Sequence, residues 1–237
     1  MKKIKNFILC VASLALCIPT NVLTVNATTQ GDGISYLNSS SSSTVKVTEL
    51  SSNSSNFSIT LEDGLVYEFE RLDYGSSMTL VNQSVQSKNY STTVVREYRC
   101  DDNTTIYDTV EISKGVTRSD VGEDIVTRET NVNNFSTVGI TATFDWNNYN
   151  STRKVQCSAM TAWHSTPSGV TCQYFNKSKS NGYVTLGKAY AKVEYKFYNT
   201  AIPVNAYSGY FKISCSDTGT ISDSVGWLTL IYLIIKH

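Results

Sequence analysis

The chain has 237 residues, and its 20 lysines and arginines balance 20 aspartates and glutamates. Hydrophobic residues make up 41% and charged residues 17%, a composition that favours a folded protein over a disordered one. No run of basic residues is suited to following a nucleic-acid backbone, so we expect no nucleic-acid partner.

The first 27 residues have the pattern of a signal peptide. Lys2, Lys3 and Lys5 precede a short apolar run at residues 7–18, and small residues lead up to Ala27. We expect cleavage after Ala27 and a secreted, extracellular mature chain. Its charge would be −3, because three lysines and no acids leave and 17 basic residues remain against 20 acidic ones.

Two alternatives to this cleavage stay open. A bacterial lipoprotein signal would acylate Cys17, although Leu16 stands where that motif has a small residue. The segment could also remain as an uncleaved anchor, although its apolar run is shorter than the roughly 20 residues that span a bilayer.

Alternation of apolar and polar residues predicts strands in the first half of the chain. Residues 57–69 form a hairpin pattern around the turn "EDG", and further strands are expected at 78–81, 92–99 and 105–112. Residues 113–134 are charged and irregular, and "RSDVGEDIVTRET" is the only stretch in them that suggests a helix.

The second half alternates more regularly, in "VGITATFDW", "AYAKVEYKFY" and "YFKISC". Strands with one apolar and one polar face predict an all-β fold, an antiparallel β-sandwich. The predicted order is a signal peptide (1–27), a flexible Ser/Asn-rich segment (28–56), a β-rich N-terminal region (57–135), a β-sandwich domain (136–224) and an apolar tail (225–237). Residues 57–135 form either a separate domain or further strands of the same sandwich.

The apolar tail is too short to span a membrane as a helix. We interpret it as a last strand or a poorly specified end. Membrane contact by residues 225–237 is the less favoured alternative.

Four cysteines remain after cleavage: Cys100, Cys157, Cys172 and Cys215. An even number in an exported chain predicts two disulfides, and four buried thiols are the alternative. The connectivity stays open. Strand alternation points both Cys157 and Cys215 inward, which permits a bridge between the two sheets.

The stretch "VQCSAMTAWHSTPSGVTC" at residues 155–172 gathers rare residue types. As a strand it places Cys157 and Trp163 on one face and His164 on the other, unless a bulge intervenes. The turn "TPSG" then predicts a hairpin in which Cys172 lies opposite Trp163. A Cys157–His164 catalytic pair is therefore not expected, although Cys172 could approach His164 across the turn.

Other catalytic and metal-binding patterns are absent from the sequence. No zinc spacing and no serine nucleophile elbow occurs. Paired carboxylates lie in turn or loop contexts, and one polar turn has possible calcium ligands. We expect no catalytic residue, no metal and no cofactor. The carboxylates are Glu62, Asp63, Asp101, Asp102, Glu123 and Asp124, and the turn holds Asp145, Asn147 and Asn150.

Fifteen tyrosines are many for this length, and several fall at outward or loop positions. Exposed aromatic residues on a sandwich suit stacking on sugar rings or a protein contact. Half-buried strand tyrosines are the ordinary alternative. The candidates for a binding surface are Tyr149, His164, Tyr190, Tyr198 and Tyr207.

The segments "GITATFDWNNYNSTRKVQCSAMTAWHSTPSGVTC", "GKAYAKVEYKFYNTAIPV" and "YFKISCSDTGTIS" resemble small secreted β-sandwich domains of unknown function from Gram-positive bacteria. The resemblance covers residues 136–224 and implies export and a β-fold. The leading hypothesis is a secreted or cell-surface-associated, non-enzymatic β-sandwich that binds a cell-wall glycan or an extracellular protein. The alternatives are a thiol- or carboxylate-based hydrolase and a secreted toxin with a membrane-active tail.

Overall fold

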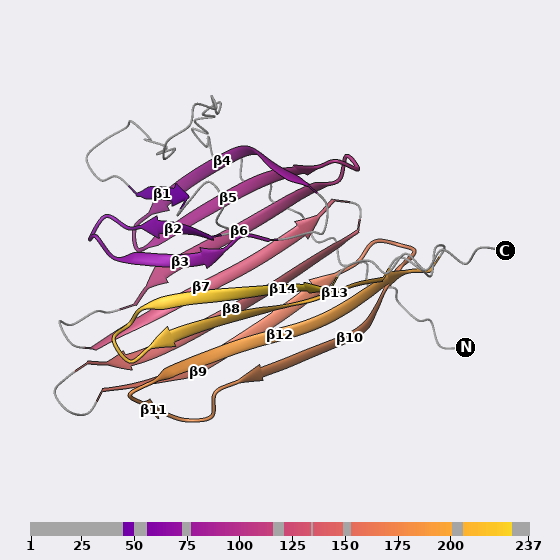
Figure 1. Cartoon of the computed structure of the whole chain (residues 1–237). Helices are drawn as coiled ribbons and strands as arrows, with labels where there is room; N and C mark the ends of the chain where they lie inside the picture. Colours follow the sequence, from indigo (N-terminus) through magenta and orange to yellow (C-terminus); the bar gives the residue numbers. More distant parts are fainter. Residues whose placement is uncertain are drawn as a thin grey trace, which may run out of the picture.

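The computed structural model describes residues 45–49, 56–72, 77–115, 121–133, 135–148, 153–200 and 206–228. The predicted all-β sandwich is confirmed, because the secondary structure of these residues consists of strands arranged in two seven-stranded sheets (Figure 1). The predicted signal peptide and most of the Ser/Asn-rich segment lie outside the described residues. The described part contains no helix long and apolar enough to cross a membrane.

Each sheet is built mainly from antiparallel neighbours. The first sheet has the order β1 (Lys46–Glu49), β2 (Asn56–Thr60), β3 (Val66–Glu70), β14 (Ile221–Leu228), β13 (Ala206–Ser216), β12 (Lys188–Asn199) and β10 (Val170–Lys179). The second sheet has the order β11 (Val184–Thr185), β9 (Lys154–Ser165), β8 (Ser136–Asn147), β7 (Val121–Val132), β6 (Thr105–Lys114), β5 (Ser91–Cys100) and β4 (Met78–Lys88).

The connectivity brings the start and the end of the described chain into one sheet. Strands β4 to β9 follow one another as antiparallel neighbours across the second sheet, and β14 returns to lie parallel to β3. Residues 57–135 and residues 136–224 therefore both supply strands to both sheets. The first four residues of the predicted apolar tail belong to β14, and residues 229–237 lie outside the described part.

Strand β7 corrects the expectation of an irregular or helical segment at 113–134. Its inward positions are buried with a period of two from Gly122 to Val132, as in any strand. Three of those inward residues are Asp124, Arg128 and Thr130, so the hydrophobic alternation that signals a strand is broken. This segment is a strand because the opposite sheet buries its polar side chains. The local sequence pattern carries no information about that sheet.

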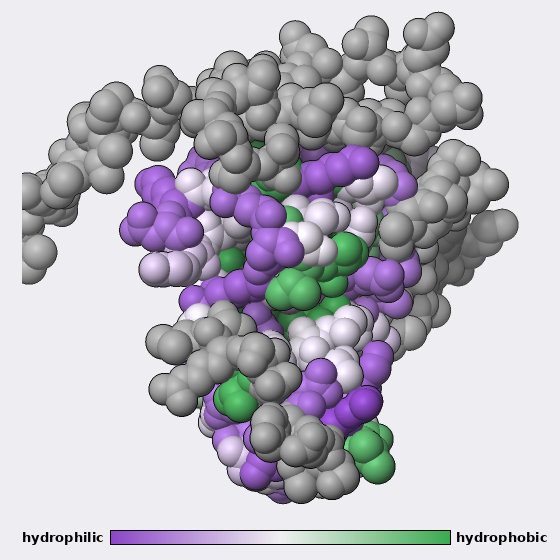
Figure 2. All heavy atoms as spheres, turned by 90° about the vertical axis from the view of Figure 1, so that its left-hand side faces the viewer, coloured by the Kyte–Doolittle hydropathy of each residue, from purple (hydrophilic) through white to green (hydrophobic). Residues whose placement is uncertain are grey.

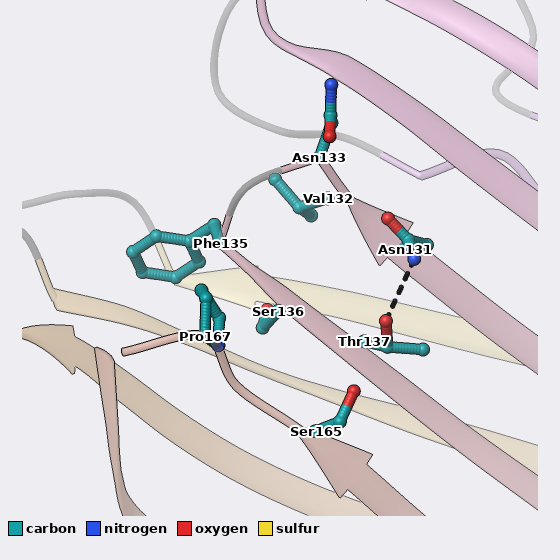
Figure 3. Close-up of a pocket in the computed structure, with 8 residues that line it drawn as sticks. All are labelled: Asn131, Val132, Asn133, Phe135, Ser136, Thr137, Ser165 and Pro167. Atoms are coloured by element: carbon teal, nitrogen blue, oxygen red, sulfur yellow. Dashed lines mark hydrogen bonds between the residues drawn. The ribbon is translucent and has the colours of Figure 1, made fainter. Parts of the chain in front are cut away.

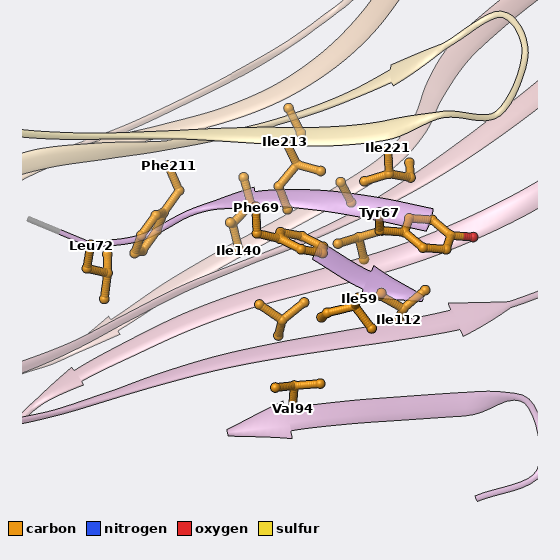
Figure 4. Packing of buried hydrophobic residues seen from close by; sticks show 14 of the residues in the cluster. Ile59, Tyr67, Phe69, Leu72, Val94, Ile112, Ile140, Phe211, Ile213 and Ile221 are labelled. Carbon is orange, nitrogen blue, oxygen red and sulfur yellow. The ribbon is translucent and has the colours of Figure 1, made fainter. Parts of the chain in front are cut away.

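The core fills the space between the sheets with aliphatic and aromatic side chains from both (Figure 4). The predicted inward residues of β8, β12 and β13 are buried there, including Phe144, Val193 and Ile213. In Figure 2, which faces the left-hand end of Figure 1, hydrophobic residues are visible among hydrophilic ones.

Aromatic side chains cover glycines on neighbouring strands at three cross-strand pairs. Trp146 lies over Gly122, and Trp163 lies over Gly139, each pair being direct partners in the ladder. Tyr210 lies over Gly226 in the same way. A Cβ at any of these glycines would overlap the ring, so the glycine is what allows the ring to lie flat on the sheet.

Candidate functional site

A β-bulge in β9 reverses the predicted orientation of His164. Thr143 pairs with Ala159 and Phe144 pairs with Cys157, so Ser158 has no partner in the β8 ladder. One extra residue moves every later side chain to the other face. His164 therefore lies on the inward face with Cys157, at the exposed rim of the sandwich.

The imidazole of His164 packs against two aromatic rings. Its centroid lies 4.7 Å from that of Phe175 and 5.6 Å from that of Phe197. Trp163 lies on the outer face of the second sheet, where its Nε1 donates a hydrogen bond of 3.0 Å to Glu129 Oε2.

The predicted hairpin between β9 and β10 is wrong. Strand β9 pairs with β8 and β11 in the second sheet, whereas β10 pairs with β12 in the first. The turn around Pro167 and Gly169 thus carries the chain from one sheet to the other. Cys172 lies opposite Phe197 rather than opposite Trp163. Turn chemistry fixes the reversal of the chain but not the sheet that the next strand joins.

All four described cysteines are free thiols, so the predicted disulfides are not formed in this structure. The Sγ of Cys172 donates to the carbonyl of Tyr174 at 3.3 Å, and burial raises the pKa of this thiol. Burial also raises the pKa of Cys157 and Cys215, and it raises that of Cys100 to about 11. A nucleophilic cysteine requires the thiolate, which these surroundings disfavour.

A charged cluster joins the two sheets inside the sandwich. Arg128 of β7 donates from Nε and Nη2 to both carboxylate oxygens of Asp108 on β6, each at 2.8 Å. Its Nη1 reaches Asp223 of β14 at 2.5 Å, and Nη2 also reaches the carbonyl of Glu70 at 2.8 Å. The side chains of Arg128, Asp108 and Asp223 are at most 1% exposed.

The same cluster supports the parallel junction of β3 and β14, where a single residue pair is in register. The amide of Glu70 donates to Asp223 Oδ1 at 2.7 Å, and the amide of Val225 donates to Glu70 Oε2 at 2.9 Å. Carboxylates thus accept backbone hydrogen bonds beside this single-pair junction. Burial raises the pKa of Asp223 to about 7, and Arg128 opposes this shift.

A second buried arginine has fewer partners. Arg96 pairs with Glu49 and stacks on Phe57, with its guanidinium carbon 4.1 Å from the ring centroid. Within the described part of the chain its Nε and Nη1 have no hydrogen-bond partner, nor has the side-chain amide of its cross-strand neighbour Gln83. Buried polar atoms of this kind commonly hold interior water. The side chains of Arg96, Arg128, Asp108 and Asp223 are sealed from solvent, so we assign them to folding rather than to catalysis.

Two of the carboxylates considered from sequence, Asp63 and Asp124, lie near Lys114, which forms an ion pair with Asp63 and is the ladder partner of Asp124. Asp124 was expected in a loop but is buried on β7, where it accepts hydrogen bonds from Tyr67 at 3.1 Å and from Trp146 at 2.7 Å. Asp63 pairs with Lys114, and Asp145 accepts from Gln156 at 2.9 Å. Among the described residues, no three His, Cys, Asp or Glu side chains form a group that could hold a metal ion. Asn150 lies outside them.

A shallow hollow of about 180 Å³ lies where the β7–β8 turn meets the end of β9 (Figure 3). Phe135 and Pro167 lie along one side of it, and Asn131 donates to Thr137 at 2.9 Å on the other. It contains no charged side chain and no nucleophile positioned by a base, so it offers no catalytic arrangement.

The tyrosine candidates divide between the interior and the surface. Tyr207 was expected at an outward or loop position but is 4% exposed, and its ring packs against Phe135 at 5.6 Å between centroids. Tyr190 and Tyr198 do point outward from β12, as predicted, although their role in binding stays a prediction. Tyr149 lies outside the described residues.

The outward tyrosines belong to a basic surface on the first sheet, which we call the lysine–tyrosine face. Three of its lysines recur at every fourth residue of β12, at positions 188, 192 and 196, and the fourth lysine, Lys212, is on β13. Tyrosines of β10, β12 and β13 lie among them, and Glu194 is the single acid, so these residues carry a net charge of +3. The face consists of Tyr174, Lys188, Tyr190, Lys192, Glu194, Lys196, Tyr198, Tyr210 and Lys212.

Neighbouring tyrosines hold two opposed lysines in place. Lys192 and Lys212 are direct cross-strand partners, an arrangement that like charges disfavour. The Nζ of Lys192 lies 4.9 Å from the ring centroid of Tyr210, and that of Lys212 lies 5.3 Å from that of Tyr190. Lys192 also pairs with Glu194 at 2.7 Å. Cation–π contacts of this kind offset part of the repulsion.

Sequence reasoning missed this face. The alternation of Lys192, Glu194 and Lys196 was visible but was interpreted only as the polar face of a strand. Lys212 and Tyr174 join it through the pairing of β12 with β13, the next strand in the chain, and with β10, which β11 separates from β12 in sequence. Comparison with models of protein families, with curated proteins and with solved structures gives no match.

Proposed function

We propose that the chain is a secreted or cell-surface-associated, non-enzymatic β-sandwich that binds an anionic cell-wall glycan through the lysine–tyrosine face. The observation that carries the proposal is the combination of a +3 surface charge with part-exposed tyrosines on one sheet. Lysines attract carboxylate or phosphodiester groups, and tyrosine rings stack on the apolar faces of sugar rings. The signal-peptide pattern supplies the expectation of export.

The absence of an activated nucleophile from the described geometry favours binding over hydrolysis. The Sγ of Cys172 donates to a backbone carbonyl, and the imidazole of His164 packs on Phe175 and Phe197. Of the carboxylates paired in the sequence, Asp124 is buried against Tyr67 and Trp146, and Asp63 forms an ion pair with Lys114. The toxin alternative depends on residues 229–237, which lie outside the described part.

Binding to immobilised polymers tests the proposal. The mature chain is passed over wall teichoic acid, a phosphodiester polymer, over polygalacturonate, a carboxylate polymer, and over neutral dextran. We expect retention on one or both anionic polymers, no retention on dextran, and release as the salt concentration rises to about 0.5 M.

Charge removal locates the site. Replacing Lys188, Lys196 and Lys212 by Gln should lower the affinity roughly 10- to 100-fold, since each lysine near an anionic surface contributes about a factor of five. The matched control replaces Lys88, Arg99 and Lys154, which lie in the second sheet, and should bind as the wild type does. Equal losses in both variants, or no retention on either anionic polymer, would remove the proposal.

A further inference from the structure

The outer face of the second sheet carries the opposite charge to the lysine–tyrosine face. Five carboxylates point outward from β5, β6, β7 and β8, and three basic residues, Lys88, Arg99 and Lys154, accompany them. The net charge of these residues is −2. We call this surface the acidic face, and its carboxylates are Glu97, Glu111, Glu123, Glu129 and Asp145.

Several acidic side chains are fixed by neighbours on the same face. Glu111 accepts a hydrogen bond from Ser91 at 2.7 Å, and Glu129 accepts one from Trp163 at 3.0 Å. The indole of Trp163 lies flat over Gly139. The acidic face therefore presents a fixed aromatic ring beside ordered carboxylates, a combination suited to a protein contact, since tryptophan and tyrosine commonly supply much of the binding energy.

The two faces are also of comparable size. At roughly 3.3 Å per residue and 4.8 Å between strands of about ten residues, the three strands of the lysine–tyrosine face present roughly 500 Å² and the four of the acidic face roughly 600 Å². Both are of the order of the 800 Å² or so that each partner buries in a standard interface. Both surfaces are sheets with the same hand of twist, and such sheets stack face to face at about 30°.

We propose that copies of this chain associate head to tail, with the lysine–tyrosine face of one copy against the acidic face of the next. Lys188, Lys196 and Lys212 then approach carboxylates such as Glu97 and Glu111, and the tyrosines approach Trp163. The two faces lie on opposite sides of each molecule, so every contact leaves one face of each kind open. Such a heterologous contact extends into a chain of copies unless it closes into a ring.

The association has a consequence for the anionic glycan of the proposed function. Both partners use the same lysines, so an anionic polymer displaces the neighbouring copy. Head-to-tail contact itself does not require that the polymer bind, because it depends only on the two faces of this chain.

Sedimentation velocity of the mature chain tests the association. At about 0.02 M salt, where the screening length is roughly 20 Å, we expect the weight-average sedimentation coefficient to rise with protein concentration up to about 100 μM. At about 0.5 M salt the chain should be a monomer, because the attraction between exposed charges is screened. A monomer at low salt over the whole concentration range would overturn the proposal.

Two variants identify the faces. One neutralises the lysine–tyrosine face (Lys188→Gln, Lys196→Gln and Lys212→Gln), and the other neutralises the acidic face (Glu97→Gln, Glu111→Gln and Glu123→Gln). Each alone should remain monomeric at low salt. An equimolar mixture should form a 1:1 dimer and nothing larger, because each variant keeps one complementary face. Association of either variant alone, or a mixture that stays monomeric, contradicts head-to-tail contact.

The acidic-face variant separates this inference from the proposed function. It keeps all four lysines of the lysine–tyrosine face, so it should bind the anionic polymers at least as well as the wild type. If polymer binding is absent while the mixture still forms the dimer, the proposed function fails and the association stands. If the anionic polymers bind while the mixture stays monomeric, the association fails and the proposed function stands. Circular dichroism of both variants verifies that they are folded.

Discussion

Replacement of Arg128 by Met is expected to be strongly destabilising. The guanidinium makes two hydrogen bonds to Asp108, one to Asp223 and one to the carbonyl of Glu70, all within the sandwich. The variant leaves two carboxylates with side chains at most 1% exposed and without their cation. Breaking a buried ion pair in this way costs about 3–5 kcal/mol, a large share of the 5–15 kcal/mol that stabilises a typical domain.

Equilibrium unfolding in urea at pH 7 measures this cost through the shift of the midpoint at constant slope. Lys192→Met is the matched control, because its ion pair with Glu194 is exposed, and it should change the free energy of unfolding by no more than about 1 kcal/mol. Adding Asp108→Leu to Arg128→Met should recover part of the loss, since it removes one of the two buried carboxylates that Arg128→Met leaves without a cation. A loss below about 1 kcal/mol for Arg128→Met, or additive losses in the double variant, refutes the reasoning.

Three further predictions concern pH, packing and thiol reactivity. Burial raises the pKa of Asp223 to about 7, so between about pH 4 and pH 7 the folded state holds a proton that the unfolded state releases. The free energy of unfolding should therefore fall as the pH rises from about 4 to 7. In a pH series of urea titrations, Asp223→Asn should flatten this part of the curve. Gly139→Ala forces the indole of Trp163 off the sheet and should cost about 1–3 kcal/mol in urea unfolding, and the cost should largely vanish in a Trp163→Ala background. The thiols should react with Ellman's reagent at pH 8 in the order of their accessibility, Cys172 first and Cys215 only when the protein unfolds. Rapid labelling of Cys215 in the native protein would contradict its burial.

The regular strands could be predicted because their signal is local. In β8, β12 and β13 an apolar side chain alternates with a polar one, and the pleat of a strand places alternate residues on opposite faces. The hairpin of β2 and β3 was also predictable, since Gly64 supplies the positive φ of its turn. These features require no knowledge of what lies opposite.

The candidate site was predicted only in part. Tyr190 and Tyr198 point outward because they alternate with buried residues of the same strand, and that alternation is written in the sequence. Tyr207 lies on the inward face with Gly209 and Phe211, but its inward orientation was not recognised because it lies near the start of β13, where few alternating residues precede it. Lys212 and Tyr174 reach the lysine–tyrosine face through strand pairing, for which the chain contains no local signal.

The sequence by itself determined the all-β, two-layer class and the faces of the regular strands, because each follows from the periodicity of neighbouring residues. Strand β7, whose inward face carries polar residues, lacks this signal. The tertiary structure alone decided the bulge at Ser158, the passage of the chain from β9 to the first sheet, and the parallel return of β14 beside β3. It also decided that the charges of Arg128, Asp108 and Asp223 lie inside the sandwich. A buried charge is stable only where opposite charges from distant strands meet it, and that meeting is a property of the whole fold.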